Sequence, residues 1–109
     1  MNEALTELAE FIDAALSGEI DEWTVAHDEL MLVVGTASVE KVLTFLRDDS
    51  NCLFKQLIDL CGADYPERDR RFDVVYNLLS LSHNQRIRVK VKVGEDEQVP
   101  SVSEVYPSA

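Results

Sequence analysis

The residues best suited to chemistry are hydroxyl and imidazole side chains in the second half of the chain, Ser80, Ser82 and His83. A serine nucleophile needs a general base within about 3 Å and a third group that orients this base. Side chains that alternate along the end of a strand are not brought to such a distance by their spacing alone. We therefore interpret the cluster as the polar end of a strand and its turn, and we expect no catalytic residue in the chain.

The histidines could also belong to a metal site. His27 is followed by Asp28, which would make two ligands, but no second cluster at ligand spacing accompanies them. A tight loop for phosphate is not expected either, because the glycines are isolated in the sequence: Gly18, Gly35, Gly62 and Gly94. We expect no metal, cofactor or small-molecule ligand, and we interpret His27 as the tip of a hairpin.

The two cysteines, Cys52 and Cys61, are nine positions apart. This spacing is neither that of a Cys-x-x-Cys redox pair nor that of half a zinc site. Apolar residues flank both of them, so we expect both to be buried as small hydrophobic side chains.

The segment RIRVKVKV, residues 86–93, has the features of an interaction surface. Apolar and basic residues alternate along it, so a strand would place each kind on its own side. The basic residues are Arg86, Arg88, Lys90 and Lys92. Exposed Lys and Arg also oppose aggregation between sheets, which would explain them without any partner. The functional interpretation is electrostatic docking onto an acidic patch of another protein, to which Arg71, in a charged turn predicted at residues 66–71, would contribute.

The composition places limits on the partners. The net charge is −11, and the acidic excess lies in the first part of the chain: residues 1–64 hold 14 Asp and Glu but only 3 Lys and Arg. Such a surface repels nucleic acids and anionic lipid heads, so we expect neither as a partner. No apolar run approaches the roughly 20 residues that a membrane-spanning helix requires. The acidic N-terminus does not have the pattern of a secretory signal.

The elements that must position these side chains follow from the hydrophobic periodicity. Apolar residues at helical spacing predict a helix that ends at Ser17-Gly18, and a second helix that Ser38 caps. Between them, residues 20–35 predict a β-hairpin. Residues 52–65 predict a short helical turn that becomes a strand, and a buried strand follows at residues 72–81. With residues 86–93, this gives an α-β-β-α-β-β-β order: an α+β two-layer sandwich, with helices on one face of a mainly antiparallel sheet.

The second half of the chain resembles a known family, the C subunit or 30-kilodalton subunit of NADH-quinone oxidoreductase, respiratory complex I. The resemblance is dense from about Leu57 to Ala109. It is carried by Asp64-Tyr65-Pro66, Arg71-Phe72, Tyr76, Leu78-Leu79-Ser80, Asn84-x-Arg86-Ile87-Arg88-Val89, Val99-Pro100-Ser101-Val102 and Tyr106-Pro107-x-Ala109. Members continue with a Trp-Phe-Glu-Arg-Glu-type signature, which this chain lacks. We expect residues 1–109 to form a single domain, the N-terminal globular part of such a subunit.

The resemblance implies a structural subunit of the hydrophilic arm, on the cytoplasmic side of the inner membrane and peripheral to it. Its partners would be the other peripheral-arm subunits, especially the D and B subunits. The family's own chain binds no flavin, iron–sulfur cluster or quinone, so any enzyme label belongs to the whole complex. Within this family, the interface hypothesis assigns Arg71, Arg86, Arg88, Lys90 and Lys92 to the contact with a neighbouring subunit.

Two rival interpretations stay open. One is a secretion-type chaperone, an acidic α/β protein that binds unfolded segments of an effector; it predicts a stable homodimer with an exposed apolar groove. The other is a small enzyme that uses Asp64, Ser82 or His83, which predicts a pocket that gathers these groups and perturbs their pKa values. The subunit interpretation predicts a monomer without such a pocket.

Overall fold

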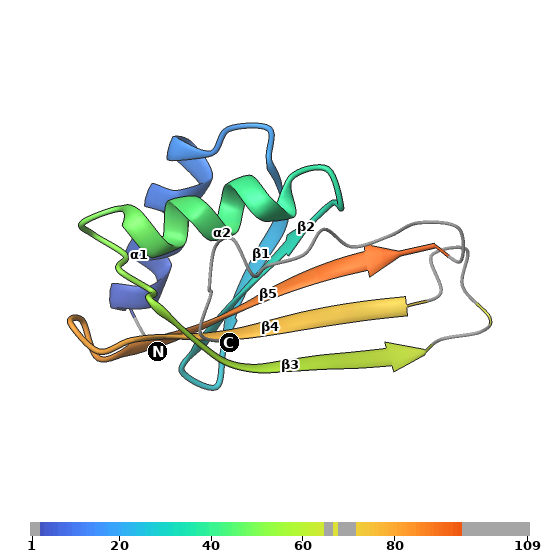
Figure 1. The fold of residues 1–109 in the computed structure, drawn as a ribbon. Helices are drawn as coiled ribbons and strands as arrows, with labels where there is room; N and C mark the ends of the chain where they lie inside the picture. The colour runs from blue at the N-terminus through green and yellow to red at the C-terminus, as the bar shows by residue number, and fades with distance from the viewer. Residues whose placement is uncertain (1–2, 65–66, 68–71, 95–109) are drawn as a thin grey trace.

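The computed structural model describes residues 3–64, 67 and 72–94. Within them, two α-helices and five β-strands follow one another in the order expected from the sequence (Figure 1). The bounds are α1 Glu3–Ala15, β1 Ile20–Ala26, β2 Glu29–Val34, α2 Val39–Asp48, β3 Gln56–Asp64, β4 Phe72–Ser80 and β5 Gln85–Val93. The α+β class, with its element order, is confirmed.

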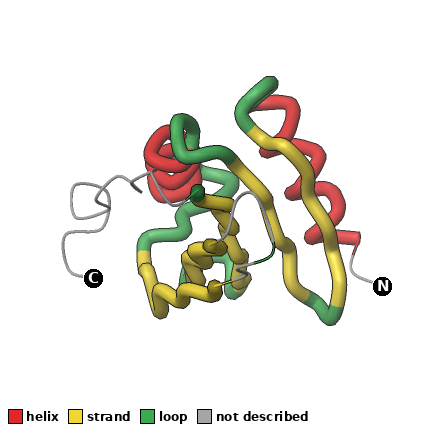
Figure 2. The backbone as a smooth tube through the Cα atoms, turned by 90° about the vertical axis from the view of Figure 1, so that its right-hand side faces the viewer, coloured by secondary structure: helices red, strands yellow, loops and turns green. Residues whose placement is uncertain are grey.

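The strands form a single sheet in the order β1-β2-β5-β4-β3. All neighbouring pairs are antiparallel except β2 and β5, which run parallel and bring the N-terminal hairpin against the C-terminal one. The sheet is strongly twisted. In the view of Figure 2 the β1–β2 hairpin runs down the right-hand part of the picture, whereas β3, β4 and β5 are seen nearly end-on.

Both helices lie on the same side of the sheet (Figure 1). We call this side the covered face. Its rows of buried side chains run across the strands, as in Leu30–Ile87–Leu78 and Leu32–Val89–Tyr76. Burial raises the pKa of Tyr76 to about 12, so its phenol stays neutral in the core.

The helices contribute their predicted apolar stripes to this core. Leu5, Leu8 and Ile12 of α1 are buried, as are Val39, Val42, Leu43 and Leu46 of α2. Gly18, after α1, has a φ of 85°, a left-handed conformation that glycine adopts without a steric penalty. No helix of the described residues is long and apolar enough to cross a membrane.

The start of α2 differs from the prediction in one detail. Ser38 is its N-cap residue, but its side chain makes no capping hydrogen bond. Hydrogen bonds from Ser38 and Lys41 instead lower the pKa of Glu19, whose Oε1 lies 3.3 Å from Lys41 Nζ. The serine hydroxyl thus ties the start of α2 to the loop after α1.

One expectation was met only in part, and another was wrong. After α2, the carbonyl oxygen of Asp49 accepts hydrogen bonds from the backbone N–H groups of Cys52 and Leu53, which closes a single turn, but residues 53–55 are already coil and β3 begins at Gln56. Cys52 is buried as expected, but Cys61 is exposed, because the strand register places it on the face opposite the helices. The charged turn at residues 66–71, apart from Glu67, and the element expected after residue 99 lie outside the described residues.

Candidate docking face

The side of the sheet opposite the helices, which we call the open face, gathers the basic side chains of β5. The alternation along this strand is as predicted: Ile87, Val89, Val91 and Val93 are buried on the covered face. Arg86 and Arg88 are exposed, and Lys90 and Lys92 are half-buried, on the open face. Four of the chain's ten basic residues therefore form one row on a molecule whose net charge is −11.

Acidic residues of the neighbouring strands pair with part of this row. Arg88 Nε lies 3.1 Å from Glu29 Oε2 of β2, and the two side chains are 45% and 39% exposed. Lys90 Nζ lies 3.5 Å from Asp73 Oδ2 of β4, whose side chain is only 4% exposed. Arg86 makes no ion pair with any carboxylate among the described residues. The Arg86 end of the row can thus pair with a carboxylate of another protein.

A shallow hollow of about 370 Å³ lies beside Arg86 and Arg88 on the open face. Ile58 and Asp59 of β3 both line it, because a β-bulge between Leu57 and Asp59 interrupts the alternation of the strand. Cys61 of β3 also lines it, together with Val75, Asn77 and Leu78 of β4. The hollow therefore joins apolar surface to charges of both signs, a combination typical of protein recognition.

The cysteine in this hollow is not set up as a nucleophile. Its Sγ donates a hydrogen bond of 3.0 Å to Asp59 Oδ2. This hydrogen bond is the largest cause that raises the pKa of the Cys61 thiol, and desolvation is the second. The positive charge of the nearby Arg88 offsets only part of the increase. Since the thiolate is the reactive form, a raised pKa makes Cys61 less reactive than an ordinary exposed cysteine.

The residues first considered for catalysis do not come together as a site. Ser80 is buried, and its Oγ accepts a hydrogen bond of 3.2 Å from the backbone N–H of His83. The imidazole of His83 turns the other way, with its Nε2 3.0 Å from the carbonyl oxygen of Ser50. Ser82 is exposed in the same turn, and the side chain of Asp64 lies outside the description. Ser80 and His83 thus hold the β4–β5 turn against the loop after α2.

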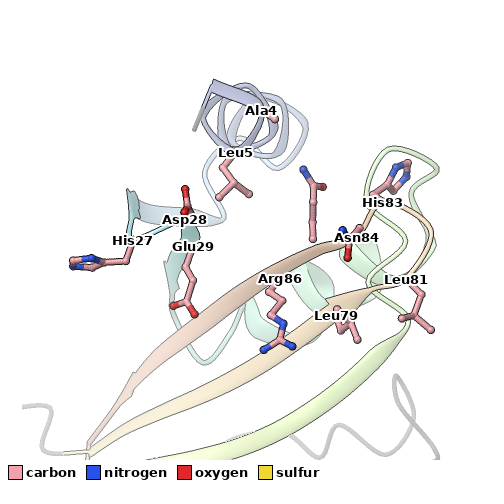
Figure 3. A pocket seen from close by; sticks show the side chains of 11 residues that line it. Ala4, Leu5, His27, Asp28, Glu29, Leu79, Leu81, His83, Asn84 and Arg86 are labelled. Atoms are coloured by element: carbon pink, nitrogen blue, oxygen red, sulfur yellow. The ribbon is translucent and has the colours of Figure 1, made fainter. Parts of the chain in front are cut away.

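A second cavity, of about 680 Å³, lies between the start of α1 and the two hairpin turns. Figure 3 shows that His27 points away from the other labelled side chains, and that His83 lies at the opposite end, on the β4–β5 turn. The described residues contain no group of three or more His, Cys, Asp or Glu that could hold a metal ion. The geometry of this cavity therefore offers no convergent chemistry.

The sequence predicted the basic row but not its surroundings. Asp73 alternates with the buried side of β4, so its place on the open face could have been inferred from the strand pattern. Glu29, Ile58 and Asp59 could not, because they depend on the parallel β2–β5 pairing and on the bulge in β3. Arg71, the fifth candidate for the interface, lies outside the described residues.

Comparison with known families gives one match that covers most of the chain. The family described as the respiratory-chain NADH dehydrogenase 30-kilodalton subunit matches residues 32–109. The matched region includes the second half of β2, α2 and the whole of β3 to β5, and therefore the complete basic row of the open face.

Individual proteins that resemble the chain are named as the C subunit of NADH-quinone oxidoreductase. The protein from Xanthobacter autotrophicus is 54% identical over 109 residues, which are 100% of this chain and 52% of that protein. The protein from Rhodospirillum rubrum is 54% identical over 107 residues, 98% of this chain and 50% of that protein. The chain thus spans about half the length of the curated relatives it matches.

Among solved structures, the fold is similar to that of a chain in the membrane-bound sulfane sulfur reductase, an archaeal respiratory membrane complex. The TM-score is 0.79 at 19% sequence identity, and the match covers 95% of this chain and 60% of the other. At this identity the likeness concerns the fold alone.

Proposed function

The chain belongs to the 30-kilodalton subunit family of the respiratory-chain NADH dehydrogenase, and from this membership we propose that it acts as a structural subunit of the hydrophilic arm of NADH-quinone oxidoreductase. In this role it carries out no redox step itself. It supports electron transfer from NADH to quinone by holding neighbouring subunits in place. The complex would lie on the cytoplasmic side of the inner membrane, with this chain peripheral to the bilayer.

The observation that carries the proposal is the basic row on the open face. Exposed ion pairs typically contribute only about 0–1 kcal/mol to folding, so the fold has little need of Arg86 and Arg88. Charges of this kind are instead effective in steering the encounter with an oppositely charged surface and in fixing its orientation. On an acidic molecule, a local row of cations selects for an acidic patch on the partner.

The partner that we propose is the D subunit of the same complex, with the B subunit next to it. Arg86 would meet a carboxylate of the partner directly, because no described carboxylate pairs with it. Arg88 and Lys90 would face the partner with their charges already partly balanced by Glu29 and Asp73. The hollow beside them would accept an apolar side chain of the same partner surface.

The test is co-purification with the D subunit after charge reversal in the complete protein. The double variant Arg86→Glu, Arg88→Glu is expected to reduce the amount of the D subunit recovered at least tenfold, the equivalent of about 1.4 kcal/mol. Lys55→Glu is a control, since it reverses an exposed charge just before β3 and outside the open-face row. Undiminished recovery of the D subunit with the double variant would contradict the proposal.

Family membership favours the subunit over the rival chaperone interpretation, which the sequence pattern leaves open. A chaperone of that kind would form a stable homodimer, whereas the subunit is expected to be a monomer before assembly. Size-exclusion chromatography with light scattering distinguishes the two. A stable dimer that resists charge reversal on the open face would favour the chaperone.

A further inference from the structure

The outer edge of β3 is a second surface, separate from the basic row. Among the described residues, β3 pairs only with β4 and forms one end of the sheet. It is nine residues long, the same length as β4 and β5. An edge strand presents backbone N–H and C=O groups that can pair with another extended chain.

Large apolar side chains accompany this backbone edge. Ile58 is 49% exposed and Leu60 is 52% exposed. They differ in their surroundings, because the bulge directs Ile58 to the hollow of the open face, whereas Leu60 pairs in register with Tyr76 and so belongs to the covered-face row. A strand added at this edge would therefore find apolar contacts on both of its sides.

The opposite edge of the sheet is built differently. The β1 strand is shorter, at seven residues, and exposes the acidic side chains of Asp21 and Glu22 near its bulge. Natural proteins use short strands, charges and bulges in this way to discourage further strand pairing. The β3 strand also has a bulge and two acidic residues, Asp59 and Asp64, but it is two residues longer than β1 and exposes the large apolar side chains of Ile58 and Leu60. Of the two edges, β3 is thus the longer and the more apolar.

Charge decides which kind of chain fits this edge. A second copy would bring another net charge of −11 and a second Asp59 to the same strand. Like charges that face each other across a strand pair are destabilising, whereas opposite charges are favourable. A chain with Lys or Arg next to Asp59 and apolar residues next to Leu60 avoids the repulsion between like charges at this edge. Such a chain is an extended, alternating segment of a different protein.

We propose that β3 is a strand-addition site, which receives an extended segment of a neighbouring subunit that carries a basic residue opposite Asp59 and an apolar residue beside Leu60. In this mode of recognition, main-chain hydrogen bonds provide affinity and alternate side chains provide specificity. The proposal rests on the chain being part of a larger assembly, but it does not depend on the basic row of the open face.

The first test compares two lysine substitutions in the complete protein within its complex. Leu60→Lys places a charge on the edge and is expected to reduce the amount of this protein recovered with the peripheral arm about tenfold, as for the loss of one interface anchor. Leu81→Lys is the matched control, because Leu81 is also large, apolar and exposed (69%) but lies in the β4–β5 turn. Unchanged recovery with Leu60→Lys would overturn the proposal.

The second test detects the backbone pairing itself and does not depend on a variant that folds. Hydrogen exchange in residues 56–64 is measured in the free protein and in the assembled complex. Strand addition predicts at least tenfold slower exchange for the outward amides of β3 in the complex, and equal rates in the two states would overturn it. A free protein that is dimeric, with β3 already protected, would show that a second copy is the occupant and would also overturn it.

The outcomes separate this proposal from the docking role of the open face. If Leu60→Lys prevents assembly and Arg86→Glu, Arg88→Glu does not, the edge is supported and the basic row is refuted. If only the charge reversal prevents assembly, and β3 exchanges equally in the free and assembled states, the edge is refuted and the basic row is supported.

Discussion

The two faces of the sheet use the same strands for different purposes. On the covered face, Ile87, Val89 and Val91 of β5 are at most 1% exposed and pack beneath the helices. On the open face, the alternate residues Arg86 and Arg88 are exposed, and Arg88 forms an ion pair with Glu29 at the surface. Because alternate side chains of one strand point to opposite faces, a single segment can serve stability on one side and recognition on the other. Substitutions on the two faces should therefore have separable effects.

The largest effect on stability is expected on the covered face. Leu78 is fully buried between Leu57 of β3 and Ile87 of β5. Leu78→Ala removes buried methyl groups and leaves a cavity, so it should lower the free energy of unfolding by about 2–5 kcal/mol. Urea unfolding followed by circular dichroism measures this change. A loss below about 0.5 kcal/mol, the range of surface substitutions, would remove the energetic distinction between the two faces.

A smaller effect is expected at the ion pair that Lys90 forms with the buried Asp73 on the open face. Asp73→Asn leaves the 4% exposed side chain without the charge that attracts Lys90, and should cost about 1–3 kcal/mol. Glu29→Gln is the matched control, because the Glu29–Arg88 pair is exposed and such pairs contribute about 0–1 kcal/mol. Equal costs for the two variants in urea unfolding would show that burial of Asp73 has no energetic consequence.

The smallest expected effect is on the reactivity of the Cys61 thiol and not on the stability of the fold. The pKa of Cys61 is raised chiefly by its hydrogen bond to Asp59, so at about pH 8 its thiolate fraction is lower than that of an ordinary exposed cysteine. Asp59→Asn removes the negative charge and lowers the pKa of Cys61, and alkylation by iodoacetamide should become several-fold faster at this pH. Cys52, buried and with a pKa raised to about 12, is the internal control that should stay unmodified in the folded protein. A slower reaction in the variant would show that Asp59 does not suppress the reactivity of Cys61.

Local patterns in the sequence predicted the elements better than their arrangement. The alternation in residues 86–93 is a property of the segment alone, so both faces of β5 could be assigned before the structure was known. The parallel pairing of β2 with β5 joins segments far apart in the chain, and no local pattern encodes it. Glu29 could therefore be placed on the docking face only from the structure.

The least accurate predictions concern β3 and the segment just before it. The segment from Cys52 to Asp64 has apolar residues at spacings that suit both a helix and a strand, and tertiary pairing with β4 selects the strand. The bulge then changes the alternation, which places Ile58 in the hollow together with Asp59. For the same reason, apolar neighbours were a poor guide to the burial of Cys61, which depends on the register with Val75.

Whether the open face recognises a neighbouring subunit can be decided by covalent labelling of lysines in the free protein and in the assembled complex. Lys90 and Lys92 lie in the basic row, whereas Lys41 projects from α2 with its side chain 66% exposed. If the open face is the docking surface, assembly reduces labelling of Lys90 and Lys92 at least several-fold relative to Lys41. Equal labelling of Lys90 and Lys92 in the free and assembled states would show that the open face remains uncovered in the complex and would contradict the docking role.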